Sequence, residues 1–288
     1  MHIRTVLLLL LAAVGFAQDF SKLAIERVAG GFTFTEGPVW SRDGYLLFSD
    51  VPDNKIWRLT NEGKSAYREA SNGANGNTFD AQGRLYSCES KSRRVTRTDK
   101  KGVIEVLADK FEGKRLNAPN DIVVRKDGHV YFTDPAFGAQ ADSRELDFYG
   151  IYHLPPKGPL ELVAKTAGRP NGIAFSPNGR LLYVADSDER VVRVFDVAAT
   201  GKATNGRTLI AKIDGPPDGI RTDEKGNIWV TCNSVAVYAP DGKFINKIDF
   251  PETPRNLTFG DNDFSTLYVT ALKTVYRVRL DIKGSVQY

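Results

Sequence analysis

The 288-residue sequence has little cysteine and little histidine: it contains two cysteines, Cys88 and Cys232, and three histidines. Two cysteines cannot hold a fold of this length together through disulfides. One histidine lies at position 2, so that only His129 and His153 remain in the body of the chain. Two separated histidines cannot supply a histidine-rich zinc cluster, and a metal site here has to be built from other ligands.

The sequence also lacks the motifs of several enzyme classes. It contains no G-x-S-x-G elbow, no catalytic cysteine–histidine pair and no glycine-rich phosphate loop, so nucleophilic-serine and nucleotide chemistry are not expected. It has no large excess of charge of one sign, because the formal net charge is +4. The densest basic run, Lys91–Lys101, alternates as a solvated strand does, and we expect no nucleic-acid partner.

Long apolar runs are absent except at the N-terminus, where Val6–Val14 follows two basic residues. This run is too short to span a bilayer, and small residues follow it at the −3 and −1 positions relative to a cut after Ala17. The pattern predicts a signal peptide over residues 1–17 and a mature protein over residues 18–288 that is periplasmic or secreted, without membrane attachment after cleavage. The alternative, a buried N-terminal helix, is disfavoured because the polar segment after the run shows no helical periodicity.

What the sequence has is an internal repeat. A polar residue leads a short segment, and a glycine stands eight positions later, in EGPVWSRDG, NGNTFDAQG, NDIVVRKDG, NGIAFSPNG and DGIRTDEKG. A further copy, NLTFGDND, lacks that glycine but keeps the turn composition. Three short segments rich in β-branched and aromatic residues follow each copy, as YLLFSD, KIWRL and SAYREA follow the first. Four strands per unit of roughly 40–50 residues predict an all-β fold, a six-bladed β-propeller with four antiparallel strands per blade.

The two ends of the repeat predict how the ring closes. The last unit stops after its third strand, near Leu280, whereas the orphan strand Leu23–Ala29 precedes the first unit. We therefore expect Leu23–Ala29 to pair with Thr274–Leu280 and to complete the last blade, which makes residues 18–288 a single domain. The cysteines fall on second strands of the second and fifth blades, on opposite sides of the ring, and are predicted to be free thiols.

The leading polar residues should converge. In a propeller the first strand of each blade lines the central channel, so these side chains are predicted to form a ring at one mouth: Glu36, Asn75, Asn120, Asn171, Asp218 and Asn256. All are oxygen donors, and two are acidic. Two carboxylates in a narrow site repel each other unless a cation neutralises them, and ligands of this kind suit Ca²⁺ or Mg²⁺ better than Zn²⁺. The alternative, that each residue only caps a turn, explains one copy better than it explains six.

A second set of acids lies about 14 positions after the leading residues, where the second strand returns toward the same mouth. It comprises Asp50, Glu89 and Asp134, with Asp186 one position later. Two roles are open for these side chains. They can orient the amide ligands from behind, or they can accept backbone N–H groups.

The segments EGPVW, RLNAPNDIVV, YFTDPAFG, RPNGIAFSPNG and PPDGI occur in this order and cover nearly the whole mature chain. In this combination the chain resembles the senescence-marker-protein/gluconolactonase/luciferin-regenerating-enzyme family. The resemblance implies a six-bladed propeller with a divalent metal in the channel, usually Ca²⁺, with Zn²⁺, Mg²⁺ or Mn²⁺ as alternatives. It also implies a metal-dependent hydrolase that opens a small-molecule sugar lactone, as a gluconolactonase does.

The resemblance also implies roles for single residues. The metal ligands would be Glu36, Asn171 and Asp218, and Asn120 would touch metal or substrate. Asp218 would be the catalytic acid/base. From these roles we expect Asn120 and Asn75 to orient the substrate ring.

Two departures from the family pattern bear on the substrate. Ser90 stands where many members have a histidine, and Ala118 stands where the animal lactonases carry a substrate arginine. Arg115, on the same loop as Ala118, is the candidate to replace that arginine.

Two other functions stay open: a phosphotriesterase-like hydrolase of the same fold, and a non-catalytic ligand-binding propeller. The sequence carries no signal for the oligomeric state.

Overall fold

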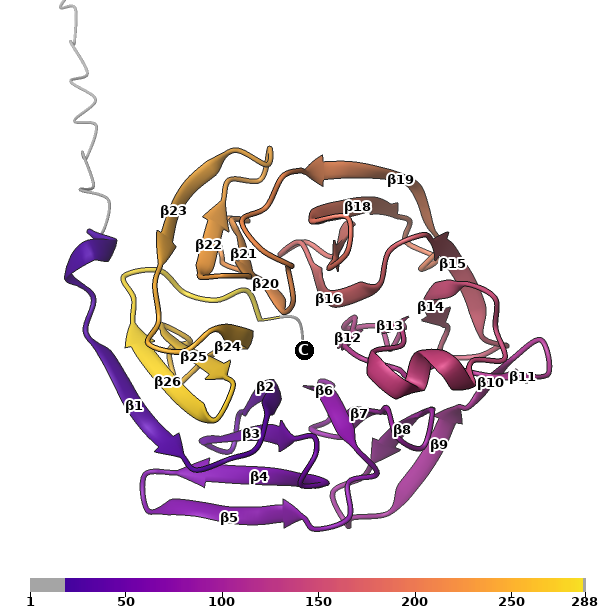
Figure 1. The fold of residues 1–288 in the computed structure, drawn as a ribbon, viewed down its shortest axis with the longest axis horizontal. Helices are drawn as coiled ribbons and strands as arrows, with labels where there is room; N and C mark the ends of the chain where they lie inside the picture. The colour runs from indigo at the N-terminus through magenta and orange to yellow at the C-terminus, as the bar shows by residue number, and fades with distance from the viewer. Residues whose placement is uncertain (1–18, 287–288) are drawn as a thin grey trace, which may run out of the picture.

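The computed structural model describes residues 19–286, which form a ring of six four-stranded antiparallel sheets around a central channel (Figure 1). The predicted six-bladed propeller is thereby confirmed. The predicted signal peptide lies outside the described residues. Within residues 19–286, no helix is both long enough and apolar enough to cross a membrane.

Each blade runs from an inner strand at the channel to an outer strand at the rim. Blade one contains β2 (Thr35–Ser41), β3 (Tyr45–Asp50), β4 (Lys55–Thr60) and β5 (Gly63–Arg68), and blade two contains β6 (Ala74–Phe79), β7 (Leu85–Glu89), β8 (Arg94–Thr98) and β9 (Ile104–Ala108). Blade three contains β12 (Ile122–Val124), β13 (Val130–Asp134), β14 (Tyr149–Leu154) and β15 (Glu161–Thr166), and blade four contains β16 (Pro170–Phe175), β17 (Leu181–Asp186), β18 (Val191–Val197) and β19 (Ala203–Ile210).

Blade five contains β20 (Ile220–Thr222), β21 (Ile228–Thr231), β22 (Val235–Tyr238) and β23 (Phe244–Ile248), and blade six contains β24 (Pro254–Gly260), β25 (Thr266–Ala271), β26 (Thr274–Arg279) and β1 (Ile25–Gly30). The remaining elements are the hairpin of β10 (Lys110–Phe111) and β11 (Lys114–Arg115) and the 3₁₀ helices η1 (Phe20–Lys22) and η2 (Gly138–Ser143).

The N-terminal strand closes the ring. β1 pairs with β26 in antiparallel register, from Ile25 opposite Val278 to Gly30 opposite Thr274. The predicted closure is therefore confirmed, with the strand one or two residues later than expected. Because the first and last parts of the chain share one sheet, the propeller has no open seam between its ends.

Burial decreases from the channel to the rim, and this explains the residue types of the strands. The inner strand β16 is buried along its whole length, whereas the outer strand β5 is almost wholly exposed. The apolar cores lie between neighbouring blades: Trp229 of blade five, 1% exposed, meets Phe259 of blade six edge to face at 5.5 Å. Cys88 and Cys232 are buried within such cores and are free thiols, as predicted.

The C-terminal tail lies across one end of the channel, where Figure 1 places the end of the described chain at the centre of the ring. The Ser285 amide donates to the carbonyl of Thr222 at 2.9 Å. Thr222 is the last residue of β20, whereas Asp218 precedes that strand, so the tail lies at the end opposite the predicted ligands. Ser285 and Val286 also line a small cavity of about 60 Å³ within the channel.

Candidate metal centre at the mouth of the channel

Backbone contacts between neighbouring blades hold the leading residues in equivalent places. In blades two and four, the glycine after the leading residue donates its amide to the carbonyl of the next leading residue: Gly76 to Asn120 at 2.7 Å, and Gly172 to Asp218 at 3.0 Å. A side chain at Gly172 would place its Cβ 2.2 Å from that carbonyl oxygen. The N-G and D-G pairs of the repeat are therefore glycine because two inner strands approach each other closely at this point.

The same contacts correct the prediction for blade six. The amide of Gly219 donates to the carbonyl of Arg255, at 2.9 Å, and not to that of Asn256. The Thr231 hydroxyl donates to the same carbonyl at 2.7 Å, as the Thr133 hydroxyl does to the carbonyl of Asn171. Arg255 is therefore the leading residue of blade six, and the prediction that Asn256 belongs to the ring is wrong by one position. Asn256 occupies the place of the glycine.

The two acids of the ring differ in their access to solvent. Glu36 is 3% exposed, and its Oε2 accepts the Gly37 amide at 3.1 Å and the Asn256 side-chain amide at 3.3 Å. The Asp218 side chain keeps 14% of its surface exposed. Asp218 can therefore contact a molecule at the mouth, whereas Glu36 lies behind the opening.

Burial raises the pKa of both acids. Glu36 has a pKa well above its ordinary value, first because it is desolvated and then because the negative charges of Asp218 and Asp121 oppose its ionisation. Burial raises the pKa of Asp218 to about 7, although the positive charge of Arg255 acts in the opposite direction. Two carboxylates in this state gain strongly from a bound cation.

The amides of the ring have free oxygen atoms. The Oδ1 atoms of Asn75 and Asn171 are buried without a hydrogen-bond partner among the described residues. The Nδ2 of Asn171 donates to the Ser187 hydroxyl at 3.1 Å, which leaves its oxygen available. Asn120, the third asparagine of the ring, is 7% exposed.

One buried carboxylate, one partly exposed carboxylate and two unpartnered amide oxygens fit a hard divalent cation better than a thiolate- or imidazole-seeking one. Within residues 19–286 no group of three or more His, Cys, Asp and Glu side chains is placed to hold a metal. A cation at this mouth therefore depends on the asparagine oxygens as well as on the acids.

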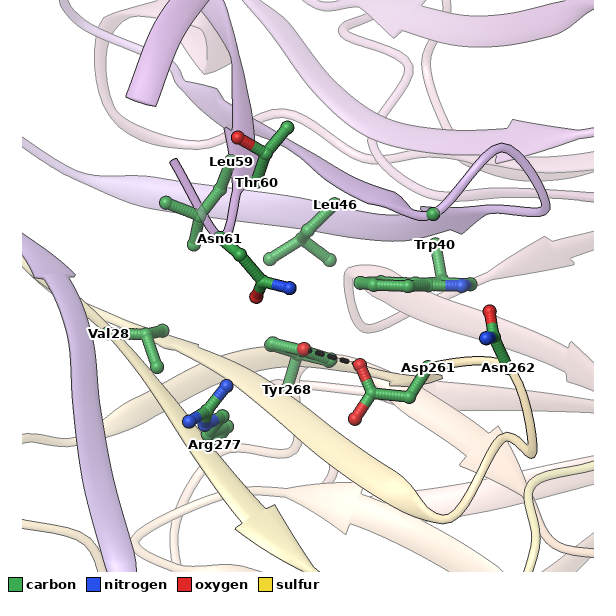
Figure 2. Close-up of a pocket in the computed structure, with 11 residues that line it drawn as sticks. Val28, Trp40, Leu46, Leu59, Thr60, Asn61, Asp261, Asn262, Tyr268 and Arg277 are labelled. Atoms are coloured by element: carbon green, nitrogen blue, oxygen red, sulfur yellow. Dashed lines mark hydrogen bonds between the residues drawn. The ribbon is translucent and has the colours of Figure 1, made fainter. Parts of the chain in front are cut away.

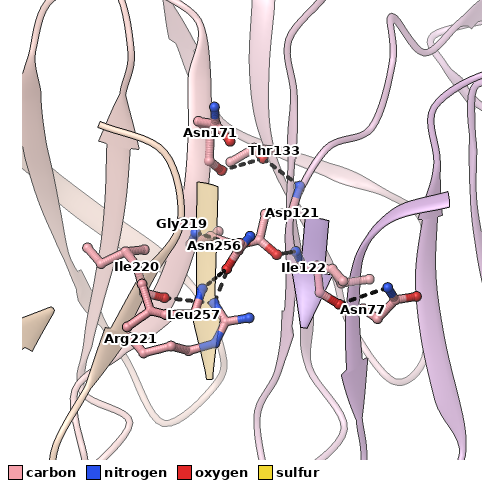
Figure 3. A network of polar contacts seen from close by, with 12 residues as sticks. Asn77, Asp121, Ile122, Thr133, Asn171, Gly219, Ile220, Arg221, Asn256 and Leu257 are labelled. Atoms are coloured by element: carbon pink, nitrogen blue, oxygen red, sulfur yellow. Dashed lines mark hydrogen bonds and ion pairs between the residues drawn. The ribbon is translucent and has the colours of Figure 1, made fainter. Parts of the chain in front are cut away.

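Beneath the ring lies a buried ion pair that was not anticipated from the sequence. Asp121 is fully buried and accepts the amide of Ile122 at 2.9 Å (Figure 3). It also accepts the amide of Ile173 at 3.2 Å. Nη1 of Arg221 lies 3.4 Å from its Oδ2 (Figure 3). The one signal in the sequence is that this position is glycine in four copies of the repeat and Asp121 and Asn256 in the other two.

The second set of acids supports the loops that lead into the blades. Asp50 accepts the amides of Thr33 and Phe34, both at 2.9 Å, and Asp134 accepts those of Asn117 and Ala118, both at 2.8 Å. Asp186 likewise accepts backbone amides of its own turn. Of the two roles left open, these three acids have the second: they accept hydrogen bonds from backbone N–H groups and do not orient ligand amides.

Glu89 has neither of the two roles that were left open. It lies fully buried between Arg68 of blade one and Arg94 of its own blade, at 3.1 and 2.7 Å. The Thr96 hydroxyl donates to it at 3.0 Å. Glu89 therefore joins two blades through ion pairs and does not contact a ligand amide.

The positions that depart from the family pattern are also structural in this protein. The Ser90 hydroxyl donates to the carbonyl of Pro119 at 2.6 Å and so fixes the residue before Asn120. Ala118 is buried. Arg115 is exposed and donates to the carbonyl of Ser92 at 3.1 Å, which turns its guanidinium toward the surface; its role toward substrate stays a prediction.

A larger cavity, of about 680 Å³, lies between blades one and six (Figure 2). Its wall includes Trp40 and Tyr268, whose rings are stacked at 5.3 Å, and the Tyr268 hydroxyl donates to Asp261 at 2.8 Å (Figure 2). Trp40 lies near the end of β2, whereas Glu36 lies near its start. This cavity is therefore separate from the ring.

Comparisons with known proteins agree with this architecture. A family model described as the SMP-30/Gluconolactonase/LRE-like region matches residues 34–273. The chain is 33% identical to the gluconolactonase of Zymomonas mobilis over 294 residues, which cover 90% of this chain and 82% of that protein. Among solved structures, it is similar to a putative gluconolactonase with a TM-score of 0.85 and 32% identity, covering 92% of this chain and 95% of the other. It is also similar to a gluconolactonase from Xanthomonas campestris with a TM-score of 0.83 and 33% identity, covering 90% of this chain and 89% of the other.

Proposed function

This chain belongs to the SMP-30/gluconolactonase/LRE-like family, and from that premise we propose that it is a lactonase that opens a sugar lactone with the help of a divalent cation. One observation carries the proposal. The buried carboxylate of Glu36, the partly exposed carboxylate of Asp218 and two buried amide oxygens without partners among the described residues lie at one mouth of the channel. The 33% identity to a gluconolactonase over 90% of the chain supports the reaction class.

The cation would be held by Glu36, Asn171 and Asp218, with Asn120 as a fourth ligand. Because the donors are all oxygen atoms, Ca²⁺ is the ion that we favour. When bound, the ion supplies the positive charge that polarises the lactone carbonyl and stabilises the oxyanion that develops on it.

Asp218 is the residue that we assign to proton transfer. Its partial exposure lets it reach a water molecule at the mouth, where a carboxylate can act as a general base. It would take a proton from the attacking water and return it to the alkoxide that leaves when the ring opens. Asp134 and Glu89, the next acids by position, are already engaged with backbone amides and arginines.

The other ring residues would position the substrate. Asn75 and Asn120 offer amide groups to the hydroxyls of a sugar lactone, and the close contact of the Gly76 amide with the Asn120 carbonyl keeps the two blades in register. The pair of Asp121 and Arg221 adds a fixed, internally balanced charge below them.

A panel of lactones assayed with and without chelator tests this proposal. We expect hydrolysis of at least one sugar lactone, loss of the activity in EDTA and recovery on addition of Ca²⁺. A panel of phosphotriesters serves as the control for the alternative hydrolase. Lactone hydrolysis that is indifferent to EDTA would contradict the role of the cation, and hydrolysis of phosphotriesters alone would contradict the substrate class.

We further propose that the protein acts outside the cytoplasm after removal of residues 1–17, on the basis of the N-terminal sequence pattern. Expression of the full chain in a Gram-negative host and N-terminal sequencing of the periplasmic or secreted product should give Gln18 as the first residue. An uncleaved chain in the cytoplasm would contradict this proposal.

A further inference from the structure

Arg255 is the unusual member of the ring. It leads blade six, and blade six lies between blade five, which carries Asp218, and blade one, which carries Glu36 (Figure 1). The arginine therefore stands between the two acids. A guanidinium cannot ligate a metal ion, so the sixth position of the ring has a different purpose from the other five.

The surroundings of Arg255 hold its backbone and leave part of its guanidinium free. The backbone carbonyl accepts Gly219 and Thr231, as described above, and the guanidinium carbon lies 5.3 Å from the centre of the Phe34 ring. Asp50 in turn holds the Phe34 amide at 2.9 Å. The aromatic ring thus presents a fixed surface against which the guanidinium can lie.

The hydrogen-bonding capacity of this guanidinium is largely unused. Its closest acid is Asp218, whose Oδ2 lies 3.8 Å from Nη1, which is beyond hydrogen-bond length. Its Nε is buried without a hydrogen-bond partner among the described residues. The side chain keeps 28% of its surface exposed, so a molecule at the mouth can reach it.

The charge balance indicates what such a molecule would carry. Glu36 and Asp218 bring two negative charges and Arg255 one positive charge, so the ring becomes positive overall once a divalent cation is bound. An arginine here weakens cation binding, because like charges repel at this range. The ring asparagines can hydrogen-bond the hydroxyl groups of a neutral sugar. A guanidinium with free N–H groups instead forms its strongest hydrogen bonds with an anion.

We propose that Arg255 receives an anionic substituent of the substrate, a carboxylate or a phosphate, so that the enzyme prefers acidic sugar lactones over neutral ones. This inference rests on the proposed lactonase function. It makes Arg255 a specificity-determining residue that contacts the substrate away from the bond that breaks.

The test compares wild type, Arg255→Gln and Arg255→Lys on three lactones at saturating Ca²⁺. The lactones are glucono-1,5-lactone, which is neutral, glucaro-1,4-lactone, which carries a carboxylate, and 6-phosphoglucono-1,5-lactone, which carries a phosphate. The control variant is Arg279→Gln, which removes the same charge from the same blade at a side chain that is 60% exposed and paired with Asp263.

In wild type we expect kcat/KM to be higher for one of the acidic lactones than for the neutral one, and the better acidic lactone identifies the anion. In Arg255→Gln, KM for that lactone should rise by roughly tenfold or more, the value expected for loss of a charge-assisted contact, while KM for the neutral lactone changes by less than about threefold. Arg255→Lys should recover part of the loss, and Arg279→Gln should behave as wild type.

Calorimetric titration with Ca²⁺ gives a second readout that does not depend on activity. Arg255→Gln should bind Ca²⁺ roughly threefold more tightly or better, because a positive charge beside Asp218 is gone. Weaker Ca²⁺ binding would mean that Arg255 only supports the ring, and would overturn the inference. Equal losses on neutral and acidic lactones would overturn it too. If wild type hydrolyses no lactone at all, it is the proposed function that fails.

Discussion

A carboxylate at the mouth of the channel has two possible tasks, holding a cation or moving a proton, and exposure separates them. Glu36 is 3% exposed and contacts Gly37 and Asn256, so it suits the first task alone. Asp218 retains 14% of its side-chain surface in solvent and can meet substrate and water. The two acids look alike in the repeat, and their different surroundings give them different chemistry.

Replacing Asp218 with asparagine tests the proton-transfer role. The substitution keeps the shape and a carbonyl ligand but removes the basic oxygen, so kcat should fall by about 10²–10⁴. The measurement is lactone hydrolysis at saturating Ca²⁺, where a weakened affinity for the ion has no effect on kcat. Activity within a few-fold of wild type would make Asp218 a ligand only.

At this scale the sequence predicts side-chain type well and register poorly. Five of six ring residues follow from the glycine that stands eight positions after each of them, and Arg255 was missed because blade six has Asp263 in place of that glycine. The polar Asn256 next to Arg255 then fitted the pattern as well. The contact that settles the register, the Gly219 amide on the Arg255 carbonyl, joins residues of two different blades and has no trace in a single repeat.

Among the elements, the inner strands are the ones whose sequence is dictated by their neighbours. β12 and β20 begin two residues after Asn120 and Asp218, although the amides of these two residues still donate to Thr133 and Thr231 in the second strands of their own blades. The repeat located these strands but could not give their first residues. The hairpin of β10 and β11 lies between blades two and three, and the helix η2 lies in the loop between β13 and β14 of blade three. Neither segment belongs to the repeated pattern, and neither was predicted.

Substitution of Gly172 by alanine tests the contact between inner strands. The new Cβ would lie 2.2 Å from the Asp218 carbonyl oxygen, so the inner strands of blades four and five must separate. We expect the free energy of unfolding to fall by about 1–3 kcal/mol, as for other overpacked sites, and Ca²⁺ affinity to fall with it. Chemical denaturation and calorimetry measure the two effects.

Gly44→Ala is the matched control for this prediction. Gly44 lies in an exposed turn with a φ of +83°, and a methyl group added there would meet no atom within 4 Å, so alanine strains the backbone without touching the ring. It should cost about 1 kcal/mol of stability and leave Ca²⁺ binding as in wild type. Unchanged Ca²⁺ affinity in Gly172→Ala would show that the contact does not position Asp218.

For the whole molecule, the buried acids make stability depend on pH. Burial raises the pKa of Asp218 and of Asp134 to about 7, and it raises the pKa of Glu36 as well. In the unfolded chain such groups titrate near about 4. A carboxyl whose pKa is raised by folding contributes stability that is complete below the unfolded value and is lost as the pH rises through the folded value.

The metal-free protein should therefore lose stability between about pH 5 and pH 8, and added Ca²⁺ should raise Tm more at pH 8 than at pH 5, because the cation binds the ionised ring. Thermal melts in EDTA and in Ca²⁺ across this range measure both effects. The variant Asp134→Asn separates the contributions, since Asp134 contacts backbone amides and lies outside the ring. A Tm in EDTA that rises with pH would contradict this account.

The position of the C-terminal tail bears on how a ligand enters and leaves the channel. Ser285 and Val286 lie across the end opposite the ring, held there by the Ser285 amide on Thr222. We therefore expect a ligand of the ring to enter and leave through the mouth at which the ring lies, and not through the end where the tail lies. The product would then have to leave this mouth before another substrate enters. We expect the hydroxy acid formed by ring opening to compete with the lactone for binding at the ring.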